Sequence, residues 1–315
     1  MRVTMITLAL VLGIVSAQAA TSRSSWVVSE IYAYNHPWKV QLPQELATKM
    51  QKMKLGAFAF YRGTAHLFYK DMQVWPVSAY SNSKTNKVWL EGDMHLQNLG
   101  AFKDASGATV FDATDFDEGF WGPYTWDVRR MAVSIVLAAR ELGLSSNDQS
   151  KLVTEFVDEY LDQMNAFSGN DSETSAKLTG SNTSGEVDDL IDKAKAKTRG
   201  ALLAKYTQVV SGQRKFLPSS ELQAVSSSTY TAINSSMSSY ISSIASSKRY
   251  PSSHYTVKDI ALKLGSGTGS LGRYRFYVLV QGSSSSNDDD VILELKQETT
   301  SAVAIAAGSL MPASS

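Results

Sequence analysis

A short polar segment, EGDMHLQNLG at residues 91–100, most strongly limits what this chain can fold into. It lies between two strand-like segments, NKVWLEG and GATVFDATDF, in which β-branched and aromatic residues alternate. Asp and Asn are common in such loops because they hydrogen-bond to their own backbone. Here, however, a carboxylate and an amide, Asp93 and Asn98, stand five positions apart. We therefore take this segment as the candidate site, and the two flanking strands as the structure that positions it.

The composition is that of a globular protein whose positive and negative charges balance. The chain has 315 residues, of which 43% are hydrophobic and 19% are charged, so it can bury one large core or two modest ones. Lys and Arg together equal Asp and Glu together, at 30 each. We therefore expect no nucleic-acid partner. The chain contains no cysteine, which excludes disulfides and thiol nucleophiles.

The first 20 residues, MRVTMITLALVLGIVSAQAA, are typical of a secretory signal peptide. One basic residue precedes an apolar run from about Met5 to Val15, and small residues follow up to Ala20. The run is short for a membrane span, although an uncleaved anchor is the alternative. We expect a secreted protein with no membrane association after cleavage. Glycosylation sequons that would fit a eukaryotic route, and that chance alone also supplies, occur at Asn170, Asn182 and Asn234.

The rest of the chain divides into two parts by pattern. Residues 21–250 are predicted to be mostly helical, with helical spacing in LPQELATKMQKMKL, TWDVRRMAVSIVLAARELG and NDQSKLVTEFVDEYLDQMNAF. Two more helices are expected at about 186–209 and 219–247, the second weakened by serines. Residues 251–315 are predicted to form an incomplete sheet segment, in which RYRFYVLVQG pairs with DVILELKQE.

The spacing of polar residues in GDMHLQN matches that of a phosphotransferase. Kinase catalytic loops place the base Asp five positions before the Asn that holds magnesium. Asp93 and Asn98 have this spacing, and the next strand supplies Asp115, with Asp117 on the same side of an extended chain. We expect Asp93 to be the base and the other three to be magnesium ligands. The alternative is that Asp93 and Asn98 are caps and that Asp117 is solvated.

A second set of residues fits phosphate binding. GTGSLG matches G-x-G-x-x-G before a strand, at Gly267, Gly269 and Gly272, where backbone amides can approach phosphates closely. The partner strand ends in ILELK, so Lys296 takes the place of the kinase lysine that pairs with phosphates. Lysine is also common at an exposed strand edge. Arg62, in FYRG, is a candidate for phosphate contact or for a link between two segments.

Two features complicate this interpretation. His95 lies beside Asp93, where a histidine more often orients a loop by hydrogen bonding than takes part in chemistry, so we keep it as a candidate for either role. The glycine loop and Lys296 also follow the catalytic loop instead of preceding it. A kinase-like fold therefore requires a circular permutation, which is possible when the original termini lie close together on the surface.

Four blocks of the sequence carry a family resemblance. GAFAFYRGTAHLFYKDM, EGDMHLQNLGAF, VFDATDFDEGFWGPYTWDVRRMAVSI and DIALKLGSGTGSLGRYRFYVLVQG with LELKQE resemble the largely bacterial family called domain of unknown function 2252. That family is similar to the aminoglycoside and choline kinase group. The kinase group has a GD-x-H-x-x-N loop followed by a strand that carries an Asp. This chain matches that pattern at Asp93, His95, Asn98 and Asp115.

The resemblance implies an α+β, protein-kinase-like fold, with ATP and magnesium as cofactors and an unknown hydroxyl acceptor. It also implies that Asp127, in TWDVRR, anchors the catalytic loop. Members of the family are expected to continue beyond the LELK strand, so the resemblance further implies that the carboxyl-terminal part of the nucleotide lobe is missing.

Other enzyme classes fit less well. Metallophosphoesterases also begin with D-x-H, but their two metals require further His and Asn ligands, whereas this chain has only four histidines and no GNH motif. A G-x-S-x-G elbow and the ligand spacing of zinc sites are absent as well. We predict a secreted phosphotransferase that moves the γ-phosphoryl group of ATP to a hydroxyl. The alternatives are a non-catalytic kinase-like binding protein and nucleotidyl transfer by the same residues. The sequence leaves the oligomeric state open.

Overall fold

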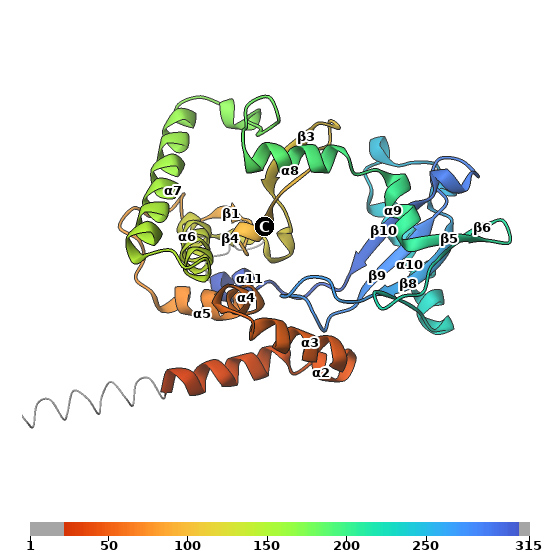
Figure 1. Cartoon of the computed structure of the whole chain (residues 1–315), viewed down its shortest axis with the longest axis horizontal. Helices are drawn as coiled ribbons and strands as arrows, with labels where there is room; N and C mark the ends of the chain where they lie inside the picture. Colours follow the sequence, from red (N-terminus) through yellow and green to blue (C-terminus); the bar gives the residue numbers. More distant parts are fainter. Residues whose placement is uncertain (1–21, 309–315) are drawn as a thin grey trace, which may run out of the picture.

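The computed structural model describes residues 22–308, so the expected signal peptide lies outside the described residues. Helices predominate and the strands form small antiparallel sheets, which agrees with a mixed α and β class (Figure 1). No described helix is both long and apolar enough to cross a membrane. Residues 22–35 are helical. The further helices are α2 (Trp38–Gln41), α3 (Pro43–Met53), α4 (Ala57–Gly63), α5 (Ala65–Val74), α6 (Tyr124–Glu141), α7 (Ser146–Phe167), α8 (Glu186–Lys195), α9 (Arg199–Tyr206), α10 (Ser227–Ser243) and α11 (Ala302–Ala307).

Three predicted helices are confirmed, and local residues explain their ends. Helix α3 begins at Pro43, whose missing amide is tolerated in the first turn. Helix α6 is followed by Gly143 at a φ of 77°, a conformation that favours glycine. The side chain of Ser145 then caps α7 by accepting a hydrogen bond from the amide of Asp148.

The two helices predicted at about 186–209 and 219–247 are confirmed only in part. The segment 186–209 breaks into α8 and α9, because Thr198 caps a new helix, and its last residues form a strand. The segment 219–247 also begins as a strand, and α10 starts only after the cap Ser226. In both segments an N-cap residue fixes where a helix begins, and the β-branched residues of β5 favour the strand that follows α9.

The strands around the candidate loop belong to two separate ribbons. The strands are β1 (Val88–Leu90), β2 (Leu99–Lys103), β3 (Thr109–Ala113), β4 (Phe120–Gly122), β5 (Thr207–Val210), β6 (Gln213–Phe216), β7 (Leu222–Ala224), β8 (Val257–Lys263), β9 (Arg275–Val280) and β10 (Val291–Lys296). Strand β1 pairs with β4, and β2 pairs with β3. The loop between β1 and β2 and the loop between β3 and β4 therefore lie at the same junction, which places their carboxylates near each other.

A four-stranded sheet in the order β10, β9, β8, β7 makes up the second part of the molecule. The predicted pairing of β9 with β10 is confirmed, with Lys296 opposite Arg275. The glycine-rich segment joins β8 to β9. Val278 of β9 is buried, whereas Tyr274, just before the strand, is 37% exposed.

The hydrophobic cores divide in the same way. Tyr69, Leu90, Trp126 and Val303 pack together, so α11 closes the core beneath β1 and β4. Two other clusters pack on opposite faces of the four-stranded sheet, one with residues of α9 and the other with residues of α10. Figure 1 shows the helices around β1 and β4 on one side and this sheet on the other. The chain passes from β10 into α11, which links the two parts.

Candidate functional site

The loop that follows β1 is fixed by one carboxylate on α6. Asp127 accepts hydrogen bonds from the amide of Glu91 at 2.7 Å and from that of Gly92 at 3.2 Å. The hydroxyl of Tyr69 donates to the carbonyl of Gly92. The role that the family resemblance implied for Asp127 is therefore confirmed. With its backbone held on both sides, this loop presents the next residue, Asp93, in a fixed orientation.

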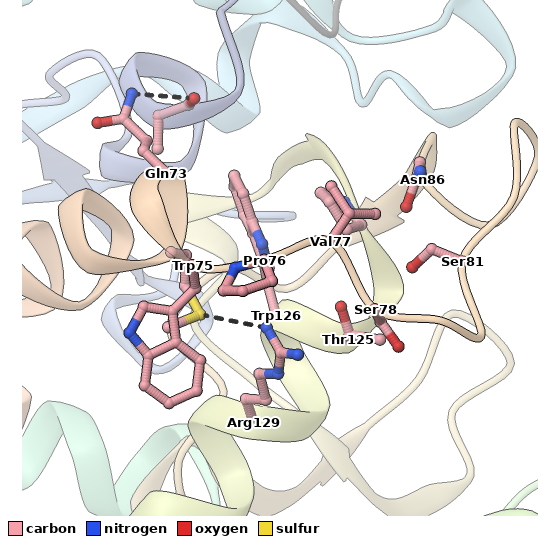
Figure 2. A pocket seen from close by; sticks show the side chains of 13 residues that line it. Gln73, Trp75, Pro76, Val77, Ser78, Ser81, Asn86, Thr125, Trp126 and Arg129 are labelled. Carbon is pink, nitrogen blue, oxygen red and sulfur yellow. Dashed lines mark hydrogen bonds between the residues drawn. The ribbon is translucent and has the colours of Figure 1, made fainter.

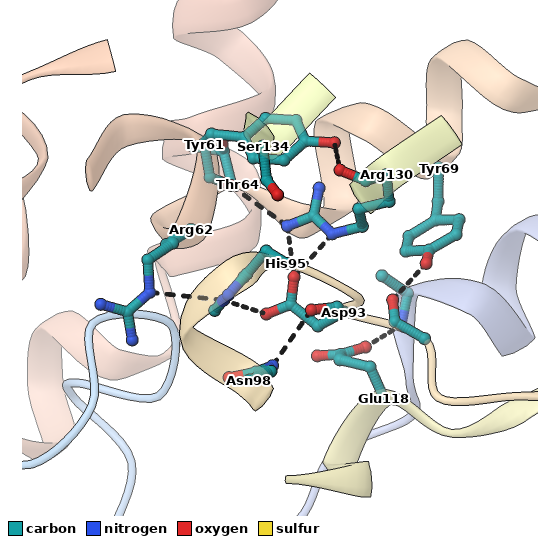
Figure 3. A network of polar contacts seen from close by, with 12 residues as sticks. Tyr61, Arg62, Thr64, Tyr69, Asp93, His95, Asn98, Glu118, Arg130 and Ser134 are labelled. Atoms are coloured by element: carbon teal, nitrogen blue, oxygen red, sulfur yellow. Dashed lines mark hydrogen bonds and ion pairs between the residues drawn. The ribbon is translucent and has the colours of Figure 1, made fainter. Parts of the chain in front are cut away.

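Asp93 is paired with a buried arginine (Figure 3). Its Oδ1 accepts a hydrogen bond from Nε of Arg130 at 2.6 Å. Arg130 is fully buried, and its guanidinium lies 4.2 Å from the ring centroid of Tyr61 and donates to the carbonyl of that residue. Burial raises the pKa of Asp93 above its ordinary value, although Arg130 acts in the opposite direction. Asp93 thus combines a fixed position with increased basicity.

His95 is buried on the other side of Asp93. Its Nδ1 lies 3.2 Å from the amide of Gln97 and its Nε2 lies 3.3 Å from Nε of Arg62 and 3.7 Å from Oδ2 of Asp93. Burial lowers the pKa of His95 to about 3, so the imidazole is neutral at pH 7. A neutral imidazole accepts a hydrogen bond at one nitrogen only, so it can accept from the amide of Gln97 or from Nε of Arg62 but not from both at once. These contacts suit a residue that orients the loop.

Glu91 and Asn98 form hydrogen bonds that connect residues within the loop. The carboxylate of Glu91 accepts from the amide of Asp93 at 2.8 Å and from Nδ2 of Asn98 at 3.2 Å. Nδ2 of Asn98 also donates to the carbonyl of Asp93 at 3.0 Å. Burial, aided by the charges of Asp93 and Asp127, raises the pKa of Glu91 to about 9. Glu91 is therefore protonated at neutral pH, and the Oδ1 of Asn98 has no hydrogen-bond donor among the described residues.

The Glu91→Gln variant is expected to flatten the dependence of stability on pH. The pKa of Glu91 is about 9 in the folded chain against a usual value of 4.5, so the folded state holds an extra proton between these values. Stability of the wild type should therefore fall as pH rises through this window, by at most about 1.4 kcal/mol per pH unit. Chemical denaturation at pH 5, 6, 7 and 8 measures the slope. Glu155→Gln, at an exposed position of α7, is the control, and parallel curves for wild type and Glu91→Gln would contradict the assignment.

Lys296 joins the second pair of predicted carboxylates. Its Nζ donates to Oδ1 of Asp115 at 3.0 Å and to Oδ1 and Oδ2 of Asp117 at 3.0 and 2.9 Å. Burial raises the pKa of Asp115, but the hydrogen bond and charge of Lys296 outweigh it and the net pKa is lowered. Asp115 has a φ of 59°, a left-handed conformation that Asp tolerates better than most residues. Residues from distant parts of the sequence thus meet at the junction between the ribbons and the sheet.

The glycine loop is packed against the amino-terminal helices. Gly267 and Gly272 have φ values of 68° and 101°, and a Cβ on Gly272 would lie 2.8 Å from Cβ of Trp38. The carbonyl of Gly269 accepts a hydrogen bond from Nζ of Lys49 at 2.8 Å. Lys49 is only 1% exposed, and burial lowers its pKa to about 7. A buried lysine of α3 therefore fixes the glycine loop through a hydrogen bond to its backbone.

The donor set is suited to magnesium only in combination with other ligands. Among residues 22–308, no group of three or more His, Asp or Glu side chains is placed to hold a metal ion. Magnesium is usually bound by one or two carboxylates together with phosphate oxygens and water. Asp115 and Asp117 supply two carboxylates that already hold one cation, the ammonium of Lys296, and Asn98 has an unused amide oxygen.

Sequence reasoning missed three residues of this site: Glu91, Lys49 and Arg130. Arg130 follows Asp127 by three positions, a spacing that places both on one face of a helix, so the motif WDVRR contained a usable signal. Glu91 stands next to the glycine that precedes Asp93, but a neighbouring Glu does not by itself indicate burial. Lys49 occurs among several charged residues of α3, and no sequence pattern separates it from them.

These features define a mixed α/β protein with a buried carboxylate–arginine pair in one loop and a glycine-rich loop between two strands of a four-stranded sheet. The chain matches the profile of a family described as uncharacterized proteins conserved in bacteria, DUF2252, over residues 41–315, and it belongs to this family. Comparison with curated proteins found no match, and comparison with solved structures found none.

Proposed function

We propose that this protein is a magnesium-dependent phosphotransferase of kinase-like fold, which transfers the γ-phosphoryl group of ATP to a hydroxyl. The contact of Lys296 with Asp115 and Asp117 carries this proposal. In kinases the glycine loop covers the phosphates and the phosphate-pairing lysine lies on a nearby strand. Here the glycine loop joins β8 to β9 and the lysine ends β10, the next strand of the same sheet. The ammonium of this lysine contacts the two carboxylates that were predicted from the sequence to be metal ligands.

Each residue has a defined role in this proposal. Asp93, whose pKa is raised by burial, accepts the proton of the attacking hydroxyl. Asp115, Asp117 and the Oδ1 of Asn98 would hold magnesium, which offsets charge on the transferred phosphoryl group when it is bound. The ammonium of Lys296, which contacts both carboxylates, would then be available to bind the phosphates of ATP. We also propose, from the signal peptide, that the acceptor is reached after secretion.

The Lys296→Met variant is expected to change two affinities in opposite directions. Removal of the ammonium frees Asp115 and Asp117, so magnesium alone should bind about tenfold more tightly, equivalent to about 1.4 kcal/mol. The same change removes a phosphate contact, so the affinity for ATP with magnesium should fall about tenfold. Calorimetric titrations with magnesium chloride and with magnesium ATP measure both. Lys103→Met, at the exposed end of β2, should change neither, and two unaltered affinities in Lys296→Met would reject this role.

A non-catalytic kinase-like protein is the second candidate, and one observation favours it. The cavity that contains Ser266, Ser270, Arg275 and Lys296 has a volume of about 10 Å³, which is room for a single water. ATP binding therefore requires the glycine loop to move away from Asp117. A scaffold without activity would bind nucleotide weakly or not at all and would release no phosphate from ATP. Nucleotidyl transfer by the same residues would instead leave a nucleoside monophosphate on the acceptor, which mass spectrometry distinguishes from a phosphoryl group.

A further inference from the structure

A cavity of about 300 Å³ lies outside the candidate site, beneath the loop that follows α5. We call it the Trp75 cavity. Its walls come from the end of α5, the loop of residues 75–87, the first turns of α6 and the end of α11 (Figure 2). Its volume is at the lower end of the range for small-molecule sites. The lining residues include Trp75, Pro76, Ser81, Asn86, Trp126 and Arg129.

The apolar walls of the cavity are largely aromatic. Trp75 is 57% exposed, whereas Trp126 is buried and is also part of the core beneath β1. Pro76 lies between these two indoles in Figure 2. The flat ring of a tryptophan offers a large apolar face that suits a planar ligand. The walls therefore favour a ligand with an aromatic or apolar body.

Arg129 supplies a cation that no acidic side chain of the described residues neutralises. Its Nη1 is 3.9 Å from Sδ of Met72, and its guanidinium is 5.5 Å from the ring centroid of Trp75. The neighbouring acids are already engaged, because Asp71 pairs with Arg23 and Asp127 binds backbone amides. The next residue of α6, Arg130, is fully buried and pairs with Asp93. Arg129 thus faces the cavity with free donors.

Two buried polar atoms in the cavity wall also have no partner. Oγ of Ser81 and Oδ1 of Asn86 are buried and form no hydrogen bond within residues 22–308. A buried polar atom that is left unpaired is unfavourable, and such atoms are normally satisfied by protein, water or ligand. Figure 2 shows both side chains on one wall, away from Arg129. A ligand that spans the cavity can reach the guanidinium with one end and Asn86 with the other.

We propose that the Trp75 cavity binds a small aromatic monocarboxylate. The carboxylate pairs with the guanidinium of Arg129, for which the fork geometry is well suited. The ring packs between Trp75, Pro76 and Trp126, and a hydroxyl on its far side donates to Oδ1 of Asn86. A carboxylate suits this partly apolar cavity better than a phosphate, because a single charge costs less to remove from water. This site is separate from the proposed nucleotide site and needs neither magnesium nor ATP.

Titration of the full chain with 4-hydroxyphenylacetate, without magnesium or nucleotide, tests this proposal. Calorimetry and quenching of tryptophan fluorescence should both show saturable binding, with a dissociation constant below about 1 mM. Phenylacetate, which lacks the hydroxyl, should bind more weakly, and the uncharged 4-hydroxyphenylethanol should bind at least about tenfold more weakly. 3-Phenylpropionate and hexanoate complete the panel and test how much of the affinity comes from the ring.

Variants locate the binding. Arg129→Gln should weaken 4-hydroxyphenylacetate binding at least about tenfold, whereas Arg140→Gln, at an exposed position of the same helix, should leave it unchanged. Asn86→Leu should reduce the affinity for 4-hydroxyphenylacetate to that for phenylacetate. Circular dichroism confirms that each variant is folded. The proposal is overturned if folded wild type binds none of the four acids saturably, or if Arg129→Gln binds them as well as wild type does.

Discussion

The Arg130→Met variant is expected to lose about 3–5 kcal/mol of folding stability, the typical cost of removing one partner from a buried ion pair. Arg130 is fully buried and its Nε is 2.6 Å from Oδ1 of Asp93, so methionine of similar length leaves a carboxylate in a low-dielectric site without its cation. The lost contact with Tyr61 adds to this cost. Urea denaturation at pH 7 measures the change.

Two further variants separate this pairing from general loss of packing. Asp93→Asn combined with Arg130→Met removes both charges, so the double variant should be much less destabilised than the sum of the two single variants. Arg129→Gln, at the preceding position of α6, removes an arginine that forms no ion pair with any described residue, so stability should change by less than about 1 kcal/mol. Strict additivity of the two single changes would show that Asp93 and Arg130 do not depend on each other.

The Asp93→Asn variant is expected to reduce phosphoryl transfer from ATP by about 10²- to 10⁴-fold, the usual contribution of a general base. An amide cannot accept the proton of the attacking hydroxyl, whereas the buried carboxylate, with its raised pKa, can. The affinity for magnesium ATP should change little, because Asp115 and Asp117 hold the proposed metal. Release of phosphate from ATP, with water as acceptor, measures turnover before the natural acceptor is known.

Stability has to be controlled in this experiment because Asp93 also pairs with Arg130. The melting temperature of Asp93→Asn sets the temperature at which its turnover is compared with that of wild type. Asp112→Asn, at an exposed position of β3, is a matched control that should keep full turnover. Undiminished phosphate release by folded Asp93→Asn would remove Asp93 from the mechanism.

Long helices and the main hairpin of the fold were predictable because their signals are local. Periodicity and capping residues located α3, α6 and α7, and two β-branched strands located β9 and β10. The pairing of β1 with β4 was not predictable, because it depends on how α11 and Trp126 pack beneath both strands. The helices predicted at about 186–209 and 219–247 are shorter than predicted, because strands occupy part of each segment and α9 and α10 begin only after the caps Thr198 and Ser226.

The candidate site shows the same division between local and tertiary information. Asp93, Asn98 and Asp115 were found by spacing, and the anchoring role of Asp127 followed from the family resemblance. The protonated state of Glu91 and the buried lysine beneath the glycine loop depend on desolvation, which arises only when distant segments come together. Sequence spacing identifies which groups are present, whereas burial decides which of them carry a charge.

Magnesium-dependent binding of ATP, measured by calorimetry on the wild type and on Asp115→Asn, tests the central claim most directly. Asparagine tolerates the left-handed backbone at this position, so the variant removes the charge without straining the loop. The proposed site predicts saturable binding by wild type that requires magnesium and that weakens at least about tenfold in Asp115→Asn. No binding by folded wild type, or equal binding by the variant, would contradict a magnesium-nucleotide site at Asp115, Asp117 and Lys296.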